Sequence, residues 1–319
     1  MGATAELSSR AIRGFFYEEF EKARNTSWVE KIANMFTSDQ ESETYKWLTQ
    51  SPVMREWIGG RHAKGFQSNG ITIENKKFEA TIEILLKDLR RDKTGQIRMR
   101  MAELVDNSYS HWLSLLSTLI NNGETGLSYD GVPYFSASHV DTNSGTYKNL
   151  LTASEVTALN VGTAAAPTAA EMADAILGVI GYMYGYLDPR GEPRNENALD
   201  FVVMVPISLW APAQKAVSGN ILMGAVGSLD NPLKGADLKL TVVPNARLTA
   251  ADWVGKFCVF RGDSRSKPFI GQSETEVDLK MKAEGSDFEF DEDAWQIGID
   301  ANRNAGYGMH HQAAKATMS

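Results

Sequence analysis

The twelve residues DGVPYFSASHVD, 130–141, hold two serines, a histidine and two aspartates, the side chains from which hydrolase and metal sites are built. A serine hydrolase would usually carry its nucleophile in a G-x-S-x-G turn, and Ser136 and Ser138 lack those flanking glycines. A metal ion could use His139 and Asp141, but two ligands are too few, and no H-E-x-x-H or C-x-x-C motif supplies others. The pattern favours a structural turn whose aromatic residues pack and whose histidine makes hydrogen bonds.

The other reactive side chains give no stronger signal. His310 and His311 lie in a tail rich in alanine and glycine, and a metal role for this pair is not favoured. Neither of the glycine motifs that bind nucleotides, G-x-x-x-x-G-K-[ST] and G-x-G-x-x-G, occurs. The single cysteine, Cys258, cannot form an internal disulfide, and its apolar neighbours predict a buried, unreactive thiol. We therefore predict no catalytic residue, no metal ligand and no cofactor.

The bulk composition excludes further classes of function. The formal net charge of -8 argues against a dedicated nucleic-acid-binding protein, which usually carries a basic domain or stripe. No apolar run reaches the roughly 18 residues needed to cross a bilayer. The first residues, MGATAELSSR, lack the apolar core of a signal peptide. We expect a protein that is made in the cytoplasm and used there or in something assembled there.

Several elements must position these residues, and hydrophobic spacing predicts them. Residues 9–50 are rich in aromatic side chains, and Trp28, Ile32 and Phe36 recur at the spacing of one helix face. Alternation at residues 71–73 and 78–84 predicts two strands, with a turn at 74–77, in a long hairpin over about 60–85.

The rest of the chain reads as a mixture of helices and strands. Apolar residues at three- and four-residue steps, without proline, predict a helix over 94–122, and Thr168 opens a second helix with a capping-box pattern. Between 199 and 262 we expect an α/β module, whose parts are strands at 199–205, 238–243 and 253–260 and a helix at 207–217 with Pro206 in its first turn. In the tail, alternation predicts strands that contain 277–281, 288–290 and 295–299. The fold class is α+β.

The order of four stretches resembles the major head (capsid) subunit of Mu-like phages. These are WVEKIANMFTSDQESETYKWLTQSPVMREWIGGR, ITIENKKFEATIEILLKDLRRDKTGQ, DGVPYFSASH and VPISLWAPAQKAV. The parts most specific to that family are Tyr45–Leu48, Met54–Arg61, Asn75–Glu79 and Asp130–Phe135. The likeness runs over about residues 10–300, and it rests on the order and spacing of the motifs rather than on any one of them.

The resemblance implies the Hong Kong 97-like capsid fold. Its parts would be an N-terminal arm, an extended β-hairpin loop, a peripheral domain with a long spine helix, and an axial domain. On this chain they would fall at residues 1–55 for the arm, 56–86 for the extended loop, 87–196 for the peripheral domain with its spine helix at 94–122, 197–265 for the axial domain, and 266–319 for the return strands and C-terminal tail.

The resemblance also implies a structural function without enzymatic activity. Copies of the chain would assemble as pentamers and hexamers into an icosahedral virion head around double-stranded DNA, in the host bacterial cytoplasm. The implied partners are a scaffolding protein, a portal and a decoration protein; because the chain starts at Met1, we expect scaffolding to be a separate protein. The residues expected at assembly interfaces are Phe15, Phe16, Trp28, Trp47, Trp57, Gly59, Gly60, Arg61, Asn75, Lys76, Phe78 and Glu79. Two alternatives stay open, an encapsulin-like nanocompartment shell and a Ser/His hydrolase.

Overall fold

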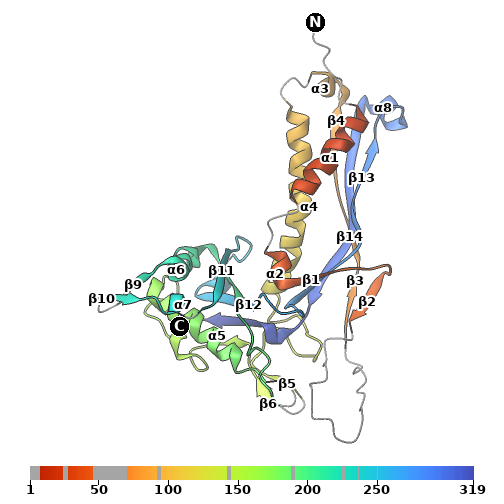
Figure 1. Cartoon of the computed structure of the whole chain (residues 1–319). Helices are drawn as coiled ribbons and strands as arrows, with labels where there is room; N and C mark the ends of the chain where they lie inside the picture. Colours follow the sequence, from red (N-terminus) through yellow and green to blue (C-terminus); the bar gives the residue numbers. More distant parts are fainter. Residues whose placement is uncertain are drawn as a thin grey trace, which may run out of the picture.

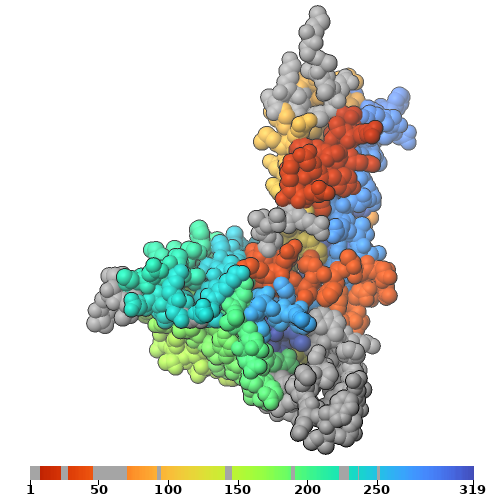
Figure 2. Space-filling model, in the orientation of Figure 1, coloured from red at the N-terminus to blue at the C-terminus, as the bar shows by residue number. Residues whose placement is uncertain are grey.

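The chain forms an elongated unit with a more compact unit at one end (Figure 1). The computed structural model describes residues 8–23, 28–45, 70–91, 95–141, 145–187, 191–224, 227–235, 237–249 and 251–319. The described N-terminal helix lies on the elongated unit, and the C-terminus lies in the compact one. The space-filling view shows the compact unit projecting to one side, so that the molecule has the outline of a bent rod (Figure 2). None of the helices in these ranges is long and apolar enough to cross a membrane.

A four-stranded sheet, in the order β1-β13-β14-β4, runs the length of the elongated unit. Its members are β1 (Ala33–Thr37), β13 (Phe269–Lys282), β14 (Ala294–Tyr307) and β4 (Lys76–Leu85). Strand β14 pairs antiparallel with both β13 and β4, whereas β1 pairs parallel with β13. The alternation of β14 is regular, because residues such as Ile297 and Ile299 face the core while their neighbours are half-exposed.

Helix α4 (Gln96–Asn121) packs along this sheet, and α1 (Ser9–Ala23) lies across α4 and the neighbouring strands. At 1.5 Å per residue the helix is roughly 39 Å long. Its apolar residues bury one stripe against the sheet, and Ile12 and Phe16 of α1 join the same core. The short helices α3 (Leu86–Arg91) and α8 (Asp287–Glu292) lie at the far end of the unit.

The compact unit is built on a five-stranded sheet in the order β11-β8-β12-β15-β7. The strands are β7 (Leu150–Leu151), β8 (Asp200–Val205), β11 (Lys239–Pro244), β12 (Lys256–Arg261) and β15 (Ala313–Thr317). Helices α5 (Ala169–Tyr184) and α6 (Ile207–Ser218) bury their apolar faces in the core of this unit, together with side chains of β8, β12 and β15. A second core, which includes Leu116, Tyr134 and Phe260, joins the end of α4 to the sheet. The two units therefore share packed side chains.

The remaining elements are short. They are α2 (Val29–Ile32), β2 (Ser42–Tyr45), β3 (Ile71–Glu74), β5 (His139–Asp141), β6 (Gly145–Tyr147), η1 (Thr157–Leu159), β9 (Ile221–Gly224), β10 (Gly227–Asp230), α7 (Pro232–Gly235), η2 (Ala251–Trp253) and η3 (His310–Gln312).

The elements with long, regular patterns are confirmed. The helix predicted over 94–122 is α4, and the helix opened by Thr168 is α5, with both hydrogen bonds of the capping box present. The helix predicted at 207–217 is α6, although Pro206 is its N-cap residue and does not enter the first turn. The strands expected at 199–205, 238–243, 277–281 and 295–299 correspond to β8, β11, β13 and β14, and the one expected at 253–260 begins later, at Lys256.

The predicted hairpin over 60–85 is wrong in its pairing. Strands β3 and β4 are separated only by Asn75, and they follow one another without the turn expected at 74–77. Strand β3 pairs with β2, and β4 pairs with β14. The alternating pattern identified the strands, but it carries no information about which strand lies beside which. Most of the N-terminal part of that hairpin lies outside the described residues.

Two further expectations are wrong for local reasons. Phe36 does not share a helix face with Trp28 and Ile32, because the chain passes from helix to strand at Ala33 and Phe36 lies in β1. The segment with Phe288 and Phe290 is helix α8 and not a strand. Ser286 caps that helix by accepting a hydrogen bond from the backbone N–H of Glu289, a local contact that favours helix over strand.

The predicted division into parts also differs from the packing. Helix α5, which falls in the range 87–196 expected for the peripheral domain, belongs to the core of the compact unit. Strand β15, at the end of the predicted return segment 266–319, pairs with β12 in the five-stranded sheet. The compact unit is therefore assembled from more of the chain than the range 197–265.

Candidate functional site: the turn after helix α4 and the exposed apolar surface

The turn after α4 is held by backbone bonds and by two buried aromatic residues. Phe135 and Tyr134 are almost fully buried, and the Tyr134 hydroxyl donates to the carbonyl of Pro268 at 2.8 Å. Gly123 lies against Phe135, since a Cβ at this position would come within 2.4 Å of the ring. Gly131 has a φ of +78°, which suits the Asp-Gly turn that precedes Val132. The turn thus packs as the sequence predicted.

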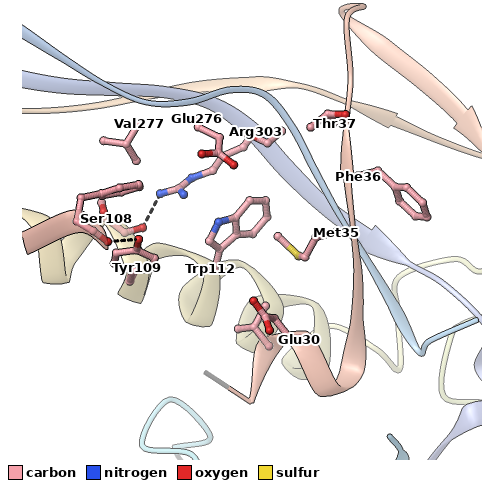
Figure 3. A pocket seen from close by; sticks show the side chains of 13 residues that line it. Glu30, Met35, Phe36, Thr37, Ser108, Tyr109, Trp112, Glu276, Val277 and Arg303 are labelled. Carbon is pink, nitrogen blue, oxygen red and sulfur yellow. Dashed lines mark hydrogen bonds between the residues drawn. The ribbon is translucent and has the colours of Figure 1, made fainter. Parts of the chain in front are cut away.

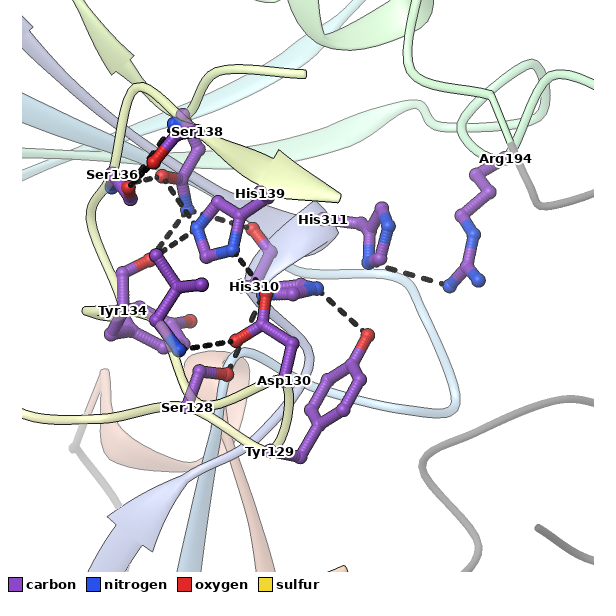
Figure 4. Close-up of polar contacts among 12 residues, drawn as sticks. Ser128, Tyr129, Asp130, Tyr134, Ser136, Ser138, His139, Arg194, His310 and His311 are labelled. Atoms are coloured by element: carbon purple, nitrogen blue, oxygen red, sulfur yellow. Dashed lines mark hydrogen bonds and ion pairs between the residues drawn. The ribbon is translucent and has the colours of Figure 1, made fainter. Parts of the chain in front are cut away.

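His139 sits in the middle of this turn with both ring nitrogens engaged (Figure 4). Its Nδ1 lies 2.6 Å from Oδ2 of Asp130, and its Nε2 lies 3.2 Å from both the carbonyl oxygen of Tyr134 and Oδ1 of Asn149. The two serine hydroxyls lie 3.2 Å from each other. Among the hydrogen bonds of the described residues, neither hydroxyl is bonded to His139. The arrangement lacks the serine–histidine contact that a nucleophile needs.

The C-terminal segment brings a second histidine to the same place. Nδ1 of His310 lies 3.7 Å from Oδ2 of Asp130 and 3.5 Å from the Ser128 hydroxyl, while its Nε2 lies 2.7 Å from the Tyr129 hydroxyl. Burial, with the nearby charges of His311, His139 and Arg194, lowers the pKa of His310 well below 6.5, so the ring is neutral at pH 7.

Asp130, His139 and His310 each offer one ligand atom, and these atoms lie within 4.8 Å of one another. From the sequence we predicted no metal ligand, and we considered Asp141 rather than Asp130 as the partner of His139. His310 was considered apart from His139. The pairing of β12 with β15 sets the position of the C-terminal segment, and local sequence patterns do not reveal that pairing. The signals in the sequence were Asp130 nine residues before His139 and the adjacent pair His310 and His311.

A cavity of about 320 Å³ lies between helices α2 and α4 and the strands β1, β13 and β14 of the long sheet (Figure 3). Arg303 crosses its wall, where Nε donates to Nδ1 of His111 at 3.0 Å and Nη2 donates to the carbonyl of Ser108 at 2.6 Å. The guanidinium also lies 5.0 Å from the centre of the Trp112 ring. Burial lowers the pKa of Arg303 to about 10. Burial, followed by the charge of Arg303, lowers the pKa of His111 to about 4.

The residues predicted at assembly interfaces are not brought together. Phe16 is fully buried in the core beneath α1, and Asn75 donates to the carbonyl of Gln40 and is nearly buried. Phe78 stacks edge-on against His111, 4.2 Å between ring centres. Phe15 and Trp28 are half-buried, whereas Lys76 and Glu79 are exposed. The remaining five, Trp47, Trp57, Gly59, Gly60 and Arg61, lie outside the described residues.

The structure also exposes large apolar side chains that were not among the residues predicted at assembly interfaces. Phe290 on α8 is 91% exposed, at the far end of the elongated unit. On the compact unit the exposed apolar residues include Leu199, Ile207, Trp210, Ile221 and Val254. Single exposed apolar residues are common, but aromatic residues are enriched at protein–protein interfaces, so Phe290 is a candidate contact residue.

Comparison with known proteins shows what the chain is similar to. A family model described as Mu-like prophage major head subunit gpT matches residues 8–164. Residues 8–164 therefore resemble the Mu-like major head subunit family. The major capsid protein of Escherichia phage Mu is 32% identical over 113 residues, and the Mu-like prophage FluMu major head subunit of Haemophilus influenzae is 32% identical over 117 residues. These matches cover 35% and 37% of this chain, and 37% and 38% of the relatives' own lengths.

Solved structures show a likeness of fold over nearly the whole chain. The procapsid of bacteriophage JBD30 aligns with a TM-score of 0.55 at 19% identity, over 97% of this chain and 75% of that one. The mature capsid of bacteriophage PhiM1 aligns at 0.55 and 10% identity, over 92% of this chain and 87% of that one. The capsid of cyanophage P-SCSP1u aligns with a TM-score of 0.54 at 13% identity, over 93% of this chain and 89% of that one. The chain has the Hong Kong 97-type α+β capsid fold, which confirms the resemblance read from the sequence.

Proposed function

We propose that this chain is the major capsid protein of a Mu-like phage head. The observation that carries the proposal is the combination of a capsid fold over nearly the whole chain with a match of residues 8–164 to the head-subunit family model. Copies of the chain would form pentamers and hexamers and close into an icosahedral shell within the virion. Such a shell is held by heterologous contacts that close on themselves, so no catalytic centre is required.

The parts of the molecule suggest how copies would meet. Helix α4 would be the spine, and the compact unit around the five-stranded sheet would be the axial domain, with α5 and β15 included because they pack there. The extended loop would begin at the paired strands β2 and β3, which the chain joins through residues 46–69, rather than at residue 56. Helix α1 would be the base of the arm, already docked on its own spine.

Exposed apolar side chains mark the surfaces that assembly would cover. Phe290 at one end and Trp210 on the compact unit are 91% and 45% exposed, and burying such surface contributes about 25 cal/mol per Å². We do not include Phe16 and Asn75 in the proposed interface, because both are buried within their own chain. We still propose as interface residues Phe15, Trp28, Lys76, Glu79 and the five that lie outside the described ranges. Phe78 would contact both its own chain and a neighbouring copy.

The proposed partners follow from this function. A scaffolding protein, a portal and a decoration protein would join the shell, and the packaged molecule would be double-stranded DNA without sequence preference. The net charge of -8 suggests that the shell repels DNA on average and holds it by confinement. Ordered DNA contacting the inner wall in a reconstruction of filled heads would contradict that view.

Electron microscopy of the purified chain tests the proposal directly. The chain would be expressed alone and together with the adjacent phage genes, sized by light scattering and imaged. Closed shells, or rings of five and six copies, are expected; a monomer or dimer under every condition would refute the capsid function. Shells that form without scaffold and enclose a protein cargo would point to the nanocompartment alternative.

Two exposed variants separate assembly from folding. Phe290→Ser changes a side chain that is 91% exposed, so the Tm of the unassembled chain should move by less than about 2 °C; Trp210 is 45% exposed, so Trp210→Ser should lower the Tm more. Shell yield should fall in at least one of them. Trp57→Ala and Phe78→Ala test the sequence-based interface, but Phe78→Ala also removes the contact with His111 and is harder to interpret. Normal shells from all four variants would refute the proposed surfaces while leaving the capsid function standing.

A further inference from the structure

We propose that Asp130, His139 and His310 bind one divalent transition-metal ion, for which zinc is the best fit. The three ligand atoms lie within 4.8 Å of one another and come from the turn after α4, the start of β5 and the segment before β15. The ion would join parts of the chain that are remote in sequence. Binding by the isolated chain does not depend on its role in a capsid.

The separations are close to those of a zinc site. Ligand atoms about 2.0–2.1 Å from a tetrahedral zinc ion lie about 3.3 Å apart. Oδ2 of Asp130 is 2.6 Å from Nδ1 of His139 and 3.7 Å from Nδ1 of His310. A shift of the carboxylate by about 0.7 Å away from the first nitrogen and about 0.4 Å toward the second would satisfy both. The Ser128 hydroxyl, 3.5 Å from the His310 nitrogen, or a water molecule would complete the tetrahedron.

The hydrogen bonds of His139 call for a cation at Nδ1. Its Nε2 faces two oxygen acceptors, the Tyr134 carbonyl and Oδ1 of Asn149, and must therefore carry the hydrogen. The orientation of Asn149 follows from its Nδ2, which donates to the same Tyr134 carbonyl and to that of His310. A neutral His139 ring would then point a lone pair at the Asp130 carboxylate across 2.6 Å. A metal ion between the two groups, or a second proton on the ring, removes this conflict.

His310 is prepared as a ligand. The Tyr129 hydroxyl lies 2.7 Å from its Nε2, so Nδ1 is the nitrogen that faces the carboxylate. Two imidazole nitrogens with one carboxylate suit zinc, whereas calcium and magnesium prefer oxygen ligands. The side chain of Asp130 is 13% exposed and that of His139 is fully buried, so an ion would enter past the carboxylate.

The test uses the full chain without a histidine tag. Protein treated with EDTA is titrated with zinc chloride, and bound zinc is counted by inductively coupled plasma mass spectrometry after gel filtration. We expect one zinc per chain and a Tm that rises by about 5 °C at a hundredfold excess over Kd. Asp130→Asn and His310→Gln should each weaken binding at least tenfold, as should His139→Gln.

His311→Gln is the matched control. His311 adjoins His310 and is equally buried, but its Nδ1 lies 3.4 Å from Arg194 and not beside Asp130. This variant should keep zinc binding even if its Tm in EDTA is lower. Zinc below about one fifth of an equivalent in the wild-type chain would overturn the proposal, and so would binding that survives Asp130→Asn and His310→Gln unchanged. In either case a doubly protonated His139 paired with Asp130 would account for the short contact.

Discussion

Acid should weaken the contact between helix α4 and strand β14 through His111. Its Nδ1 accepts a hydrogen bond from Nε of Arg303 at 3.0 Å, so that nitrogen must be unprotonated for the bond to exist. Burial, followed by the charges of Arg303 and Arg247, lowers the pKa of His111 from 6.5 to about 4. Protonation would replace the acceptor with a second positive group beside a buried guanidinium.

The sign and size of the effect follow from proton linkage. As the pH falls, the unfolded chain protonates this histidine near pH 6.5 and the folded chain only near pH 4. The free energy of unfolding is therefore unaffected well above pH 6.5 and declines between pH 6.5 and 4. Between pH 7 and 5 these two pKa values give a loss of about 1.8 kcal/mol. Because His111 is only half-buried, solvent screening reduces this to about 1 kcal/mol.

The variant His111→Asn isolates this contribution. Asparagine offers an oxygen acceptor near the position of Nδ1 and does not titrate, while His310 and His311 remain in both proteins and contribute equally. The Tm of each protein would be measured between pH 7 and 5 by scanning fluorimetry. The wild type should lose about 2–3 °C more than the variant over that range. Parallel Tm curves, or a steeper loss in the variant, would refute the reasoning about the Arg303 contact.

Three further predictions concern packing and reactivity. Phe16→Ala should lower the free energy of unfolding, measured by urea titration, by about 3–5 kcal/mol. Tyr17→Ala, on the exposed face of the same helix, should lower it by less than about 1 kcal/mol. Equal losses would contradict the packing of α1 against the core. Gly308→Ala places a Cβ 2.5 Å from a backbone carbonyl oxygen, whereas the Cβ of Gly271→Ala lies 2.5 Å from a methionine side chain that can move. Gly308→Ala should therefore lower the Tm more. The reverse order would contradict this packing. Burial raises the pKa of the Cys258 thiol to about 12, so a thiol reagent at pH 8 should label it only in denaturant, and rapid labelling of the folded chain would show that it is accessible.

The long elements of the fold could be predicted from the sequence because their patterns repeat many times. Helix α4 holds apolar residues at three- and four-residue steps over 26 positions, and β14 alternates over 14. Each repeat adds evidence for the same period, and the burial of one face follows from it. Short segments offer no such redundancy. The six residues of α8 alternate aromatic and acidic side chains like a strand, yet the Ser286 cap and the chain reversal there make them a helix.

The family resemblance, with its order of motifs, also came from the sequence by itself, and it led to the fold class and to the proposed function. Tertiary structure decided which segments meet. It paired β3 with β2 instead of β4, and it buried Phe16 and Asn75, two of the residues expected at interfaces. It also placed His310 beside His139 and Asp130. The physical reason is that hydrophobic period is a local property, whereas strand partners and side-chain clusters depend on contacts between distant segments that no local pattern encodes.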